Sequence, residues 1–208
     1  MRKLMLLVML VSASCLLAQE LKPITLPPPE TDGGRPLMQV LKDRKTTREF
    51  AADKLPPQIL SNLLWSAFGV NRPDGRRTAP SAMNKQEVDI YVATGDGLFV
   101  YNAQGNRLDP VLVQDVRAAT GTQPFPASAP LDLVYVADLA KAGSEPDADL
   151  YTAADTGFIA QNVYLYCASE GLATVVRGSI DRVALAKAMK LRPDQKIILA
   201  QTVGYPKK

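Results

Sequence analysis

Histidine is missing from this chain of 208 residues. Its absence excludes hydrolases built on Ser-His-Asp or Cys-His nucleophiles, and it removes the commonest metal ligand. Carboxylates alone could still bind a metal, but no group of acidic residues has the spacing of a ligand set. A catalytic role for this chain would therefore depend on an organic cofactor, whose own atoms carry the chemistry while the protein positions it.

Cysteine is scarce, and one of the two cysteines lies in a predicted leader. Arg2 and Lys3 are followed by an apolar run over residues 4–17 and by the small residue Ala18. This layout is typical of a secretory signal peptide, and the run is too short to favour a membrane-spanning helix. We therefore expect residues 1–18 to be a signal peptide and the protein to be exported to the periplasm.

Loss of the leader would leave Cys167 as the only thiol, so no disulfide within the chain would be possible. Cys167 lies in an apolar helical stretch, where a cysteine ordinarily acts as a small buried hydrophobic side chain. The alternative for the leader is a lipid anchor at Cys15, although Ser12 and Leu16 fit a lipoprotein cleavage site poorly.

The chain also lacks a large net charge of either sign. The chain has 24 basic and 21 acidic residues, and loss of Arg2 and Lys3 with the leader brings the net charge near +1. This balance gives no reason to expect a nucleic acid partner. Because 47% of the residues are hydrophobic and no tract is of low complexity, we expect one globular domain at residues 36–208. Residues 19–35 are rich in proline and glycine and are predicted to form an extended arm; a disordered linker is the alternative.

The periodicity of apolar residues predicts both helices and strands. Helices are expected over residues 36–45, 56–68, 111–119, 150–170 and 181–190, and strands over residues 87–93, 97–101, 106–108, 131–137 and 196–203. The two kinds of element alternate irregularly and include a hairpin. The expected class is therefore α+β rather than a regular βαβ winding.

A first polar segment has the residue types that bind a phosphate group. Arg44 and Arg48 are four residues apart and share a face if the chain is helical there, with Lys45 and Thr46 between them. Arginines bind phosphate through charge-assisted hydrogen bonds, and a hydroxyl adds another bond. The alternative is a solvated basic helix end beside acidic neighbours.

A second polar segment, residues 77–86, leads directly into an alternating strand. Its small and amide-bearing side chains, Ser81, Ala82, Asn84 and Gln86, would let a flat polar ring approach the backbone and form hydrogen bonds. The alternative is an ordinary loop that uses proline, serine and asparagine for its turns. Together the two segments favour a cofactor with an anionic end and a heteroaromatic end, such as FMN, over a metal ion.

Over residues 36–206 the chain resembles the FMN-dependent nitroreductases, and it looks closest to the branch that includes the azoline-oxidising dehydrogenases of thiazole-peptide pathways. Five motifs stand in the family's order: Arg44, Thr46 and Arg48; Ala79 to Gln86; Gln161 and Asn162; Gly171-Leu172 leading to Arg177-Gly178; and Val203 to Pro206. Any one of these motifs is weak, but five in order are fairly specific.

The resemblance implies a nitroreductase-like fold, with a central, mostly antiparallel sheet flanked by helices in a domain-entwined homodimer. It implies that Arg177-Gly178 brings a backbone N–H close to the flavin N5 and that Lys207 approaches the phosphate. Some relatives have further lysine and asparagine contacts to the pyrimidine side of the flavin ring. This sequence has no matching residues for them, and Arg117 and Asn71 are only loose substitutes. The cofactor-binding residues expected from the matched motifs are Arg44, Lys45, Thr46, Arg48, Pro80, Ser81, Ala82, Asn84, Gln86, Arg177, Gly178 and Lys207.

The implied function is an exported FMN-dependent oxidoreductase that passes hydride through flavin N5 in a ping-pong reaction with a small organic substrate. NADH or NADPH is the family's usual donor, but both are cytoplasmic, so export favours another reductant or a dehydrogenase reaction. Two alternatives stay open: a protein that binds flavin or another small ligand without turnover, and a scaffold without flavin that serves as an interaction surface.

Overall fold

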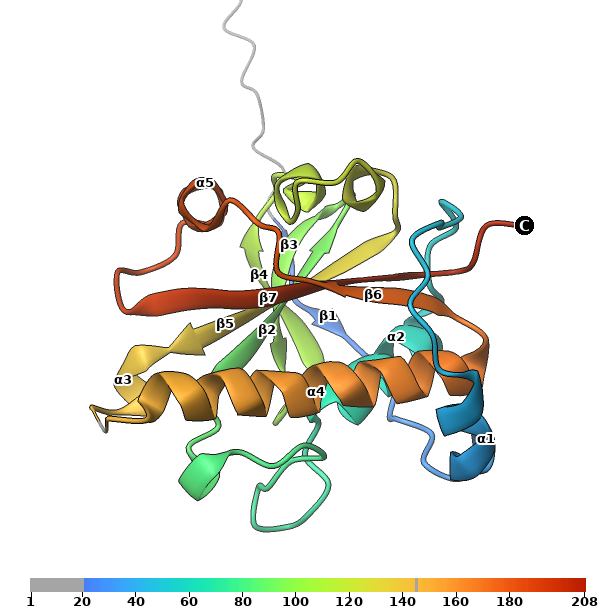
Figure 1. Ribbon diagram of the computed structural model, residues 1–208, viewed down its shortest axis with the longest axis horizontal. Coiled ribbons are helices and arrows are strands. Elements are labelled where there is room, and N and C mark those ends of the chain that lie inside the picture. Colours follow the sequence, from blue (N-terminus) through green and yellow to red (C-terminus); the bar gives the residue numbers. More distant parts are fainter. Residues whose placement is uncertain (1–20, 145) are drawn as a thin grey trace, which may run out of the picture.

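The computed structural model describes residues 21–144 and 146–208, so the expected signal peptide and the start of the arm lie outside the described residues. Seven strands form one sheet in the order β1-β4-β3-β2-β5-β7-β6, and every neighbouring pair is antiparallel (Figure 1). The strands are β1 (Ile24–Thr25), β2 (Val88–Thr94), β3 (Gly97–Asn102), β4 (Arg107–Leu112), β5 (Leu131–Asp138), β6 (Ala173–Arg177) and β7 (Gln195–Gly204).

Helices cover both faces of this sheet. Helix α2 (Pro57–Phe68) and the long helix α4 (Ala148–Glu170) pack on one face, and α5 (Arg182–Ala188) packs on the other. The shorter helices are α1 (Leu37–Asp43), α3 (Leu139–Ala142) and three 3-10 turns at Ala82–Asn84, Arg117–Ala119 and Phe125–Ala127. In the part of the chain that the structure describes, no helix has the length and apolarity of a membrane span. The predicted α+β class, an antiparallel sheet flanked by helices, is confirmed.

The central strands supply side chains to a core on each face. In β2, Ile90 and Val92 join the core under α2 and α4, whereas Tyr91 and Ala93 join the core under α5. This is the period-two alternation of a strand with both faces covered. All eight residues of β5 are buried, which explains why its sequence is almost continuously apolar.

The prediction of a helix over residues 111–119 is wrong. Strand β4 continues to Leu112, which pairs with Leu98 of β3, and only residues 117–119 form a 3-10 turn. Val111 is β-branched and fits a pleated strand better than a helix. Pairing with β3 therefore overrides the helical spacing of the apolar residues.

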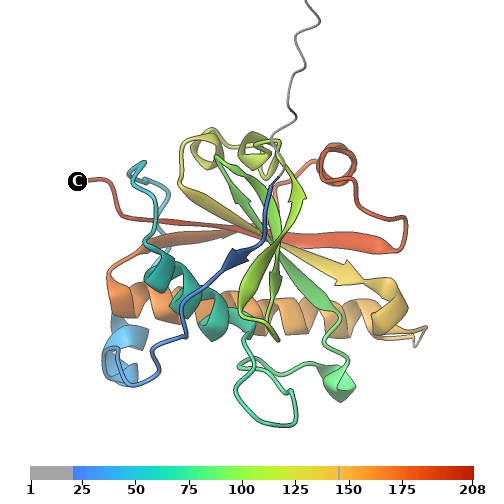
Figure 2. The same ribbon diagram turned by 180° about the vertical axis from the view of Figure 1, so that it is seen from behind.

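The described part of the arm runs along the outside of its own chain (Figure 2). In β1, Ile24 pairs with Leu108 of β4. The Ser61 hydroxyl on α2 donates to the Pro27 carbonyl at 2.5 Å, and the Arg35 N–H donates to the Ser169 hydroxyl at 3.0 Å. These contacts fix the arm from the sheet edge to the end of α4.

A buried ion pair joins three strands at the end of β6. The Arg177 guanidinium lies 2.6 Å from the Asp132 carboxylate of β5, and the two side chains are 3% and 0% exposed. The Thr202 hydroxyl of β7 donates to the same carboxylate oxygen, and Arg177 donates to the Thr120 carbonyl. A Cβ on Gly121 would lie 2.0 Å from the guanidinium, so only glycine leaves room for it.

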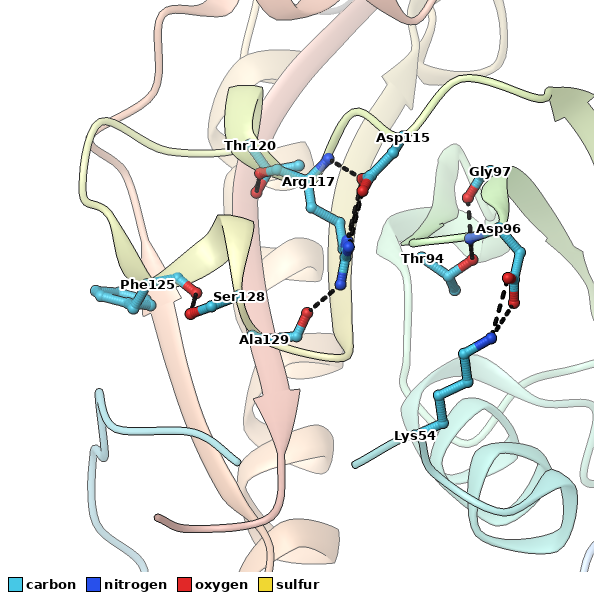
Figure 3. A network of polar contacts seen from close by, with 10 residues as sticks. All are labelled: Lys54, Thr94, Asp96, Gly97, Asp115, Arg117, Thr120, Phe125, Ser128 and Ala129. Atoms are coloured by element: carbon cyan, nitrogen blue, oxygen red, sulfur yellow. Dashed lines mark hydrogen bonds and ion pairs between the residues drawn. The ribbon is translucent and has the colours of Figure 1, made fainter. Parts of the chain in front are cut away.

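A second polar network lies near the surface, at the hairpin of β2 and β3 and the loop before β5 (Figure 3). The exposed Lys54 ammonium donates to both oxygens of Asp96, at 2.7 and 3.0 Å. Arg117 donates to the Asp115 carboxylate and to the Ala129 carbonyl, each at 2.7 Å. Arg117, considered above as a loose substitute for a ring contact, is therefore committed to fixing this loop.

Candidate cofactor site

The predicted phosphate segment, residues 44–48, follows α1 and lies beside the C-terminus. The N–H of Lys207 donates to the Glu49 carbonyl at 3.2 Å, and the N–H of Thr47 donates to the Thr174 carbonyl of β6 at 3.0 Å. These backbone bonds bring residues from opposite ends of the domain side by side. Lys207 consequently lies next to the segment that contains Arg44 and Arg48.

Tyr164 of α4 anchors this segment to the helix. Its hydroxyl lies 3.0 Å from the Thr46 hydroxyl and accepts a hydrogen bond from the Val176 N–H at 3.0 Å. The Arg44 guanidinium lies over the Tyr164 ring, 5.3 Å from its centroid, which is a cation–π contact. Tyr164 was not among the predicted site residues, because nothing in its sequence neighbourhood distinguishes it from core aromatics.

The cations of the segment are left available for an anion. Within residues 21–144 and 146–208, none of Arg44, Lys45, Arg48 and Lys207 forms an ion pair. The carboxylate of the nearby Asp43 is instead bound by Arg35 at 2.5 Å. Unpaired arginines and lysines beside a hydroxyl form a positive site that suits a phosphate group.

The second polar segment, residues 77–86, is called the ring loop below, and its backbone is strained. Met83, Asn84 and Gln86 have φ angles of 52°, 56° and 48°, in the left-handed region that side chains other than glycine rarely adopt. The loop is nevertheless held firmly, because the Gln86 N–H donates to the Ser81 hydroxyl at 3.0 Å. Strain that is held in place by surrounding contacts is common in segments that bind ligands.

The Gln86 side chain is used to build this loop. Its amide oxygen accepts from Arg77 at 2.9 Å, and its amide nitrogen donates to Asn84 at 3.0 Å and to the Gly75 carbonyl at 3.2 Å. Arg77 in turn donates to the Phe68 carbonyl at the end of α2. The loop is thus tied to α2 through Arg77, and the donors of the Gln86 amide are satisfied within the chain.

A second anchor of the loop comes from α4. The Ala82 N–H donates to the buried carboxylate of Asp155 at 2.8 Å. Asp155 was also not among the predicted site residues, because in the sequence it is one of several acidic residues on a long helix.

Gly178 follows the buried Arg177 side chain and is exposed. The fold does not require glycine there, because an added Cβ would meet nothing closer than Leu199, at 3.8 Å. With the Arg177 guanidinium turned inward, only the backbone of this pair is accessible to a ligand.

No metal site competes with this arrangement: among the described residues, no three acidic or cysteine side chains gather as metal ligands could. Comparison with known proteins identifies the chain, since residues 41–205 match the Nitroreductase family. The chain belongs to the nitroreductase family. A nitroreductase-family protein of Methanocaldococcus jannaschii is 30% identical over 169 residues, which cover 75% of this chain and 85% of that protein.

Solved structures confirm the nitroreductase fold. A nitroreductase structure from Ralstonia eutropha JMP134 has 45% sequence identity and a TM-score of 0.86, covering 89% of this chain and 90% of that one. The NADPH:FMN oxidoreductase of Vibrio harveyi, complexed with NAD⁺, has 18% identity and a TM-score of 0.64, covering 83% and 69% of the two chains. A chain of the Escherichia coli microcin synthetase McbBCD complex has 19% identity and a TM-score of 0.70, covering 100% and 85%.

The two halves of the predicted nitroreductase site are held at different points of α4. Thr46 contacts Tyr164, and Ala82 contacts Asp155, which lies nine residues earlier on the helix. Nine residues of α-helix rise about 14 Å. In Figure 1 the phosphate segment crosses the C-terminal end of α4, while the ring loop hangs on the side of the helix away from the sheet. Within one chain, the residues that anchor the two halves are therefore about 14 Å apart along α4.

A separate cleft of about 420 Å³ lies between the arm, α2 and α4. Its lining includes Trp65, Asn162 and Tyr166, and none of the twelve predicted site residues. The Trp65 indole donates to the Val70 carbonyl at 3.0 Å, so its polar edge is already bound within the chain.

The strained loop leads to a prediction about Met83. Replacement by glycine removes the cost of a left-handed side-chain conformation, so Met83→Gly should raise the free energy of unfolding by roughly 1 kcal/mol. Leu41→Gly is the matched control, because Leu41 is also exposed but lies in helix α1. It should lower the free energy of unfolding by about 1 kcal/mol. Equal losses in urea denaturation of both variants would show that the loop is not strained.

Proposed function

We propose that this chain is an exported FMN-dependent oxidoreductase that acts on a small organic substrate. The observation that carries the proposal is the phosphate segment. It contains Arg44, Lys45 and Arg48 and is bonded to Lys207 through the adjacent Glu49 carbonyl, and none of these four cations forms an ion pair in the described part of the chain. A doubly charged phosphate end would neutralise this cluster through charge-assisted hydrogen bonds, with the Thr46 hydroxyl as a further donor. Export rests on the predicted leader at residues 1–18.

The residues present fit FMN at both ends. The unpaired cations would hold its phosphate, and the small residues Ser81 and Ala82 with the Asn84 amide would meet its ring. The exposed backbone at Gly178 offers an N–H with no side chain in the way. When bound, the isoalloxazine would exchange a hydride at N5 with a donor and then an acceptor, which gives ping-pong kinetics. The protein would bind, orient and shield this group, and no protein nucleophile is needed.

We propose that two copies of the chain form the complete site. Helix α4 buries one face on the sheet, yet Leu150, Tyr151 and Phe158 are 64%, 41% and 48% exposed on its outer face. A helix that is apolar on two faces is expected to pack against a partner on the second one. A second copy seated there would bury this face, as the domain-entwined homodimer implied by the family resemblance requires.

The proposed dimer predicts the effect of a charge on the outer face of α4. Phe158→Glu should shift the protein from dimer to monomer, because the new carboxylate would be buried without a partner in the interface. Val183→Glu on α5 is the control, since Val183 is 83% exposed and lies on the opposite side of the sheet. Sedimentation analysis measures both masses. The dimer proposal fails if the parent protein is a monomer, or if Phe158→Glu leaves the mass unchanged.

The electron donor is the open part of the proposal. The Vibrio harveyi relative is an NADPH:FMN oxidoreductase, which supports NAD(P)H as a donor within the fold. Export would separate this chain from cytoplasmic NAD(P)H, and that favours a different reductant or a dehydrogenase reaction on its own substrate. The motif resemblance to azoline-oxidising dehydrogenases supports the second choice.

An absorbance spectrum separates enzyme from carrier. The purified protein, titrated with FMN, should show a bound flavin band that bleaches anaerobically with a hydride donor, NADPH being the first to try. A bound band that resists NADPH and other reductants would favour the alternative, a flavin-binding protein without turnover. Absence of binding at any FMN concentration would exclude a flavin protein and favour the scaffold alternative.

The phosphate assignment is tested by reversing one charge. Arg48→Glu replaces a charge-assisted bond worth about 1.5–3 kcal/mol by repulsion, so FMN affinity should fall roughly 10- to 100-fold or more. Lys187→Glu makes the same charge change on the exposed surface of α5 and controls for net charge. Fluorescence titration measures both dissociation constants, and equal values for the two variants would refute the assignment.

A further inference from the structure

A pair of carboxyl groups is buried directly beneath the ring loop. Glu87 follows the last loop residue and is 2% exposed, and Asp155 on α4 is 3% exposed. Asp155 accepts the N–H of Ala82 from the loop at 2.8 Å. Within the described residues, neither carboxylate oxygen of Glu87 has a well-formed hydrogen bond. A buried, ionised and unsatisfied carboxylate would be strongly unfavourable.

Burial raises the pKa of Glu87, and the neighbouring Asp155 carboxyl raises it further by repulsion and by hydrogen bonding. The backbone N–H of Glu87 itself and, to a smaller extent, the Thr152 hydroxyl favour the charged form and lower the pKa, but they do not outweigh these effects. Two adjacent carboxylates cannot hydrogen-bond to each other, whereas a carboxylic acid can donate to a carboxylate. Asp155 already accepts a backbone N–H from Ala82, so Glu87 is assigned as the donor of the pair.

Other charges around Glu87 are engaged elsewhere. The N–H of Asp138 on β5 donates to the Glu87 carbonyl, but the Asp138 carboxylate faces Arg192 at 3.1 Å. Lys85, two residues before Glu87, donates to the Ala142 carbonyl at 2.5 Å. Asp155 is thus the charged neighbour that acts on the Glu87 carboxyl.

We propose that Glu87 and Asp155 share one proton, and that this pair positions the ring loop through the bond from Asp155 to Ala82. Glu87 keeps its proton and donates it to Asp155, and Asp155 clamps the loop by accepting the Ala82 N–H. Loss of the shared proton would place two negative charges under the loop and loosen it. The role toward a flavin ring rests on the proposed function, but the proton and the clamp do not.

The shared proton is tested on the protein without flavin. The folded chain should keep the Glu87 proton at pH values where the unfolded chain, with a pKa near 4.5, has lost it. The contribution of Glu87 to stability should therefore fall as pH rises from about 4.5 to its raised folded pKa, and then level off. The unfolding constant should grow about tenfold for each pH unit in that window.

Glu87→Gln keeps the shape and the donor of a neutral acid but cannot titrate, so this part of the pH dependence should be absent. Glu170→Gln, at the exposed end of α4, should retain it. Denaturation of the three proteins between pH 4 and 9 gives the comparison. Identical pH profiles for the parent and Glu87→Gln would overturn the shared proton.

The clamp is tested by hydrogen exchange of the Ala82 amide. Asp155→Asn keeps an acceptor oxygen and should retain most of the protection. In Asp155→Ala the protection factor of the Ala82 amide should fall at least tenfold. Equal protection in both variants would overturn the positioning role. If these results hold but FMN never binds, the pair stands and the proposed function fails. If FMN binds, ionisation of its phosphate contributes the same pH dependence to both proteins. The parent should lose affinity relative to Glu87→Gln as pH rises, and a constant ratio of the two affinities would overturn the role toward the ring.

Discussion

The packing of α4 on the sheet is the constraint on which the rest of the structure depends. Its inner face covers the central strands, and side chains at its edges hold two segments that the sequence keeps far apart. Tyr164 fixes the phosphate segment, and Asp155 fixes the ring loop. Because both contacts are made by one rigid helix, the spacing of the two segments is set by helix geometry and not by the loops themselves.

The interior of the protein uses charge sparingly and beside the site. Arg177 and Asp132 are buried where β6 ends, immediately before Gly178. Glu87 and Asp155 are buried where β2 begins, immediately after the ring loop. Each pair lies directly beside a backbone segment of the candidate site. Buried polar groups contribute little net stability, but they can specify one conformation, and here they fix the segments that the proposed function needs fixed.

The sequence predicted the elements whose signals are local. Helix α2 follows two prolines, α4 ends at Gly171, and β5 reads as a buried apolar run. It did not predict β6, because this strand of five residues has no clear boundary from the helix stop before it, and it misread residues 111–119. Tyr164, Asp155 and Glu87 were missed for a different reason: their roles arise only from contacts with residues distant in sequence. The amide of Gln86 was predicted to meet a ligand, yet its donors are used within the loop.

The two edges of the sheet are both covered by the first thirty residues that the structure describes. Strand β1 pairs with β4 at one edge, and the segment at Thr47 donates to Thr174 of β6 at the other. An open edge strand is a template for pairing with another chain, which leads to aggregation. The phosphate segment therefore has a second consequence for the molecule: its bond to β6 keeps part of a sheet edge from pairing with another chain.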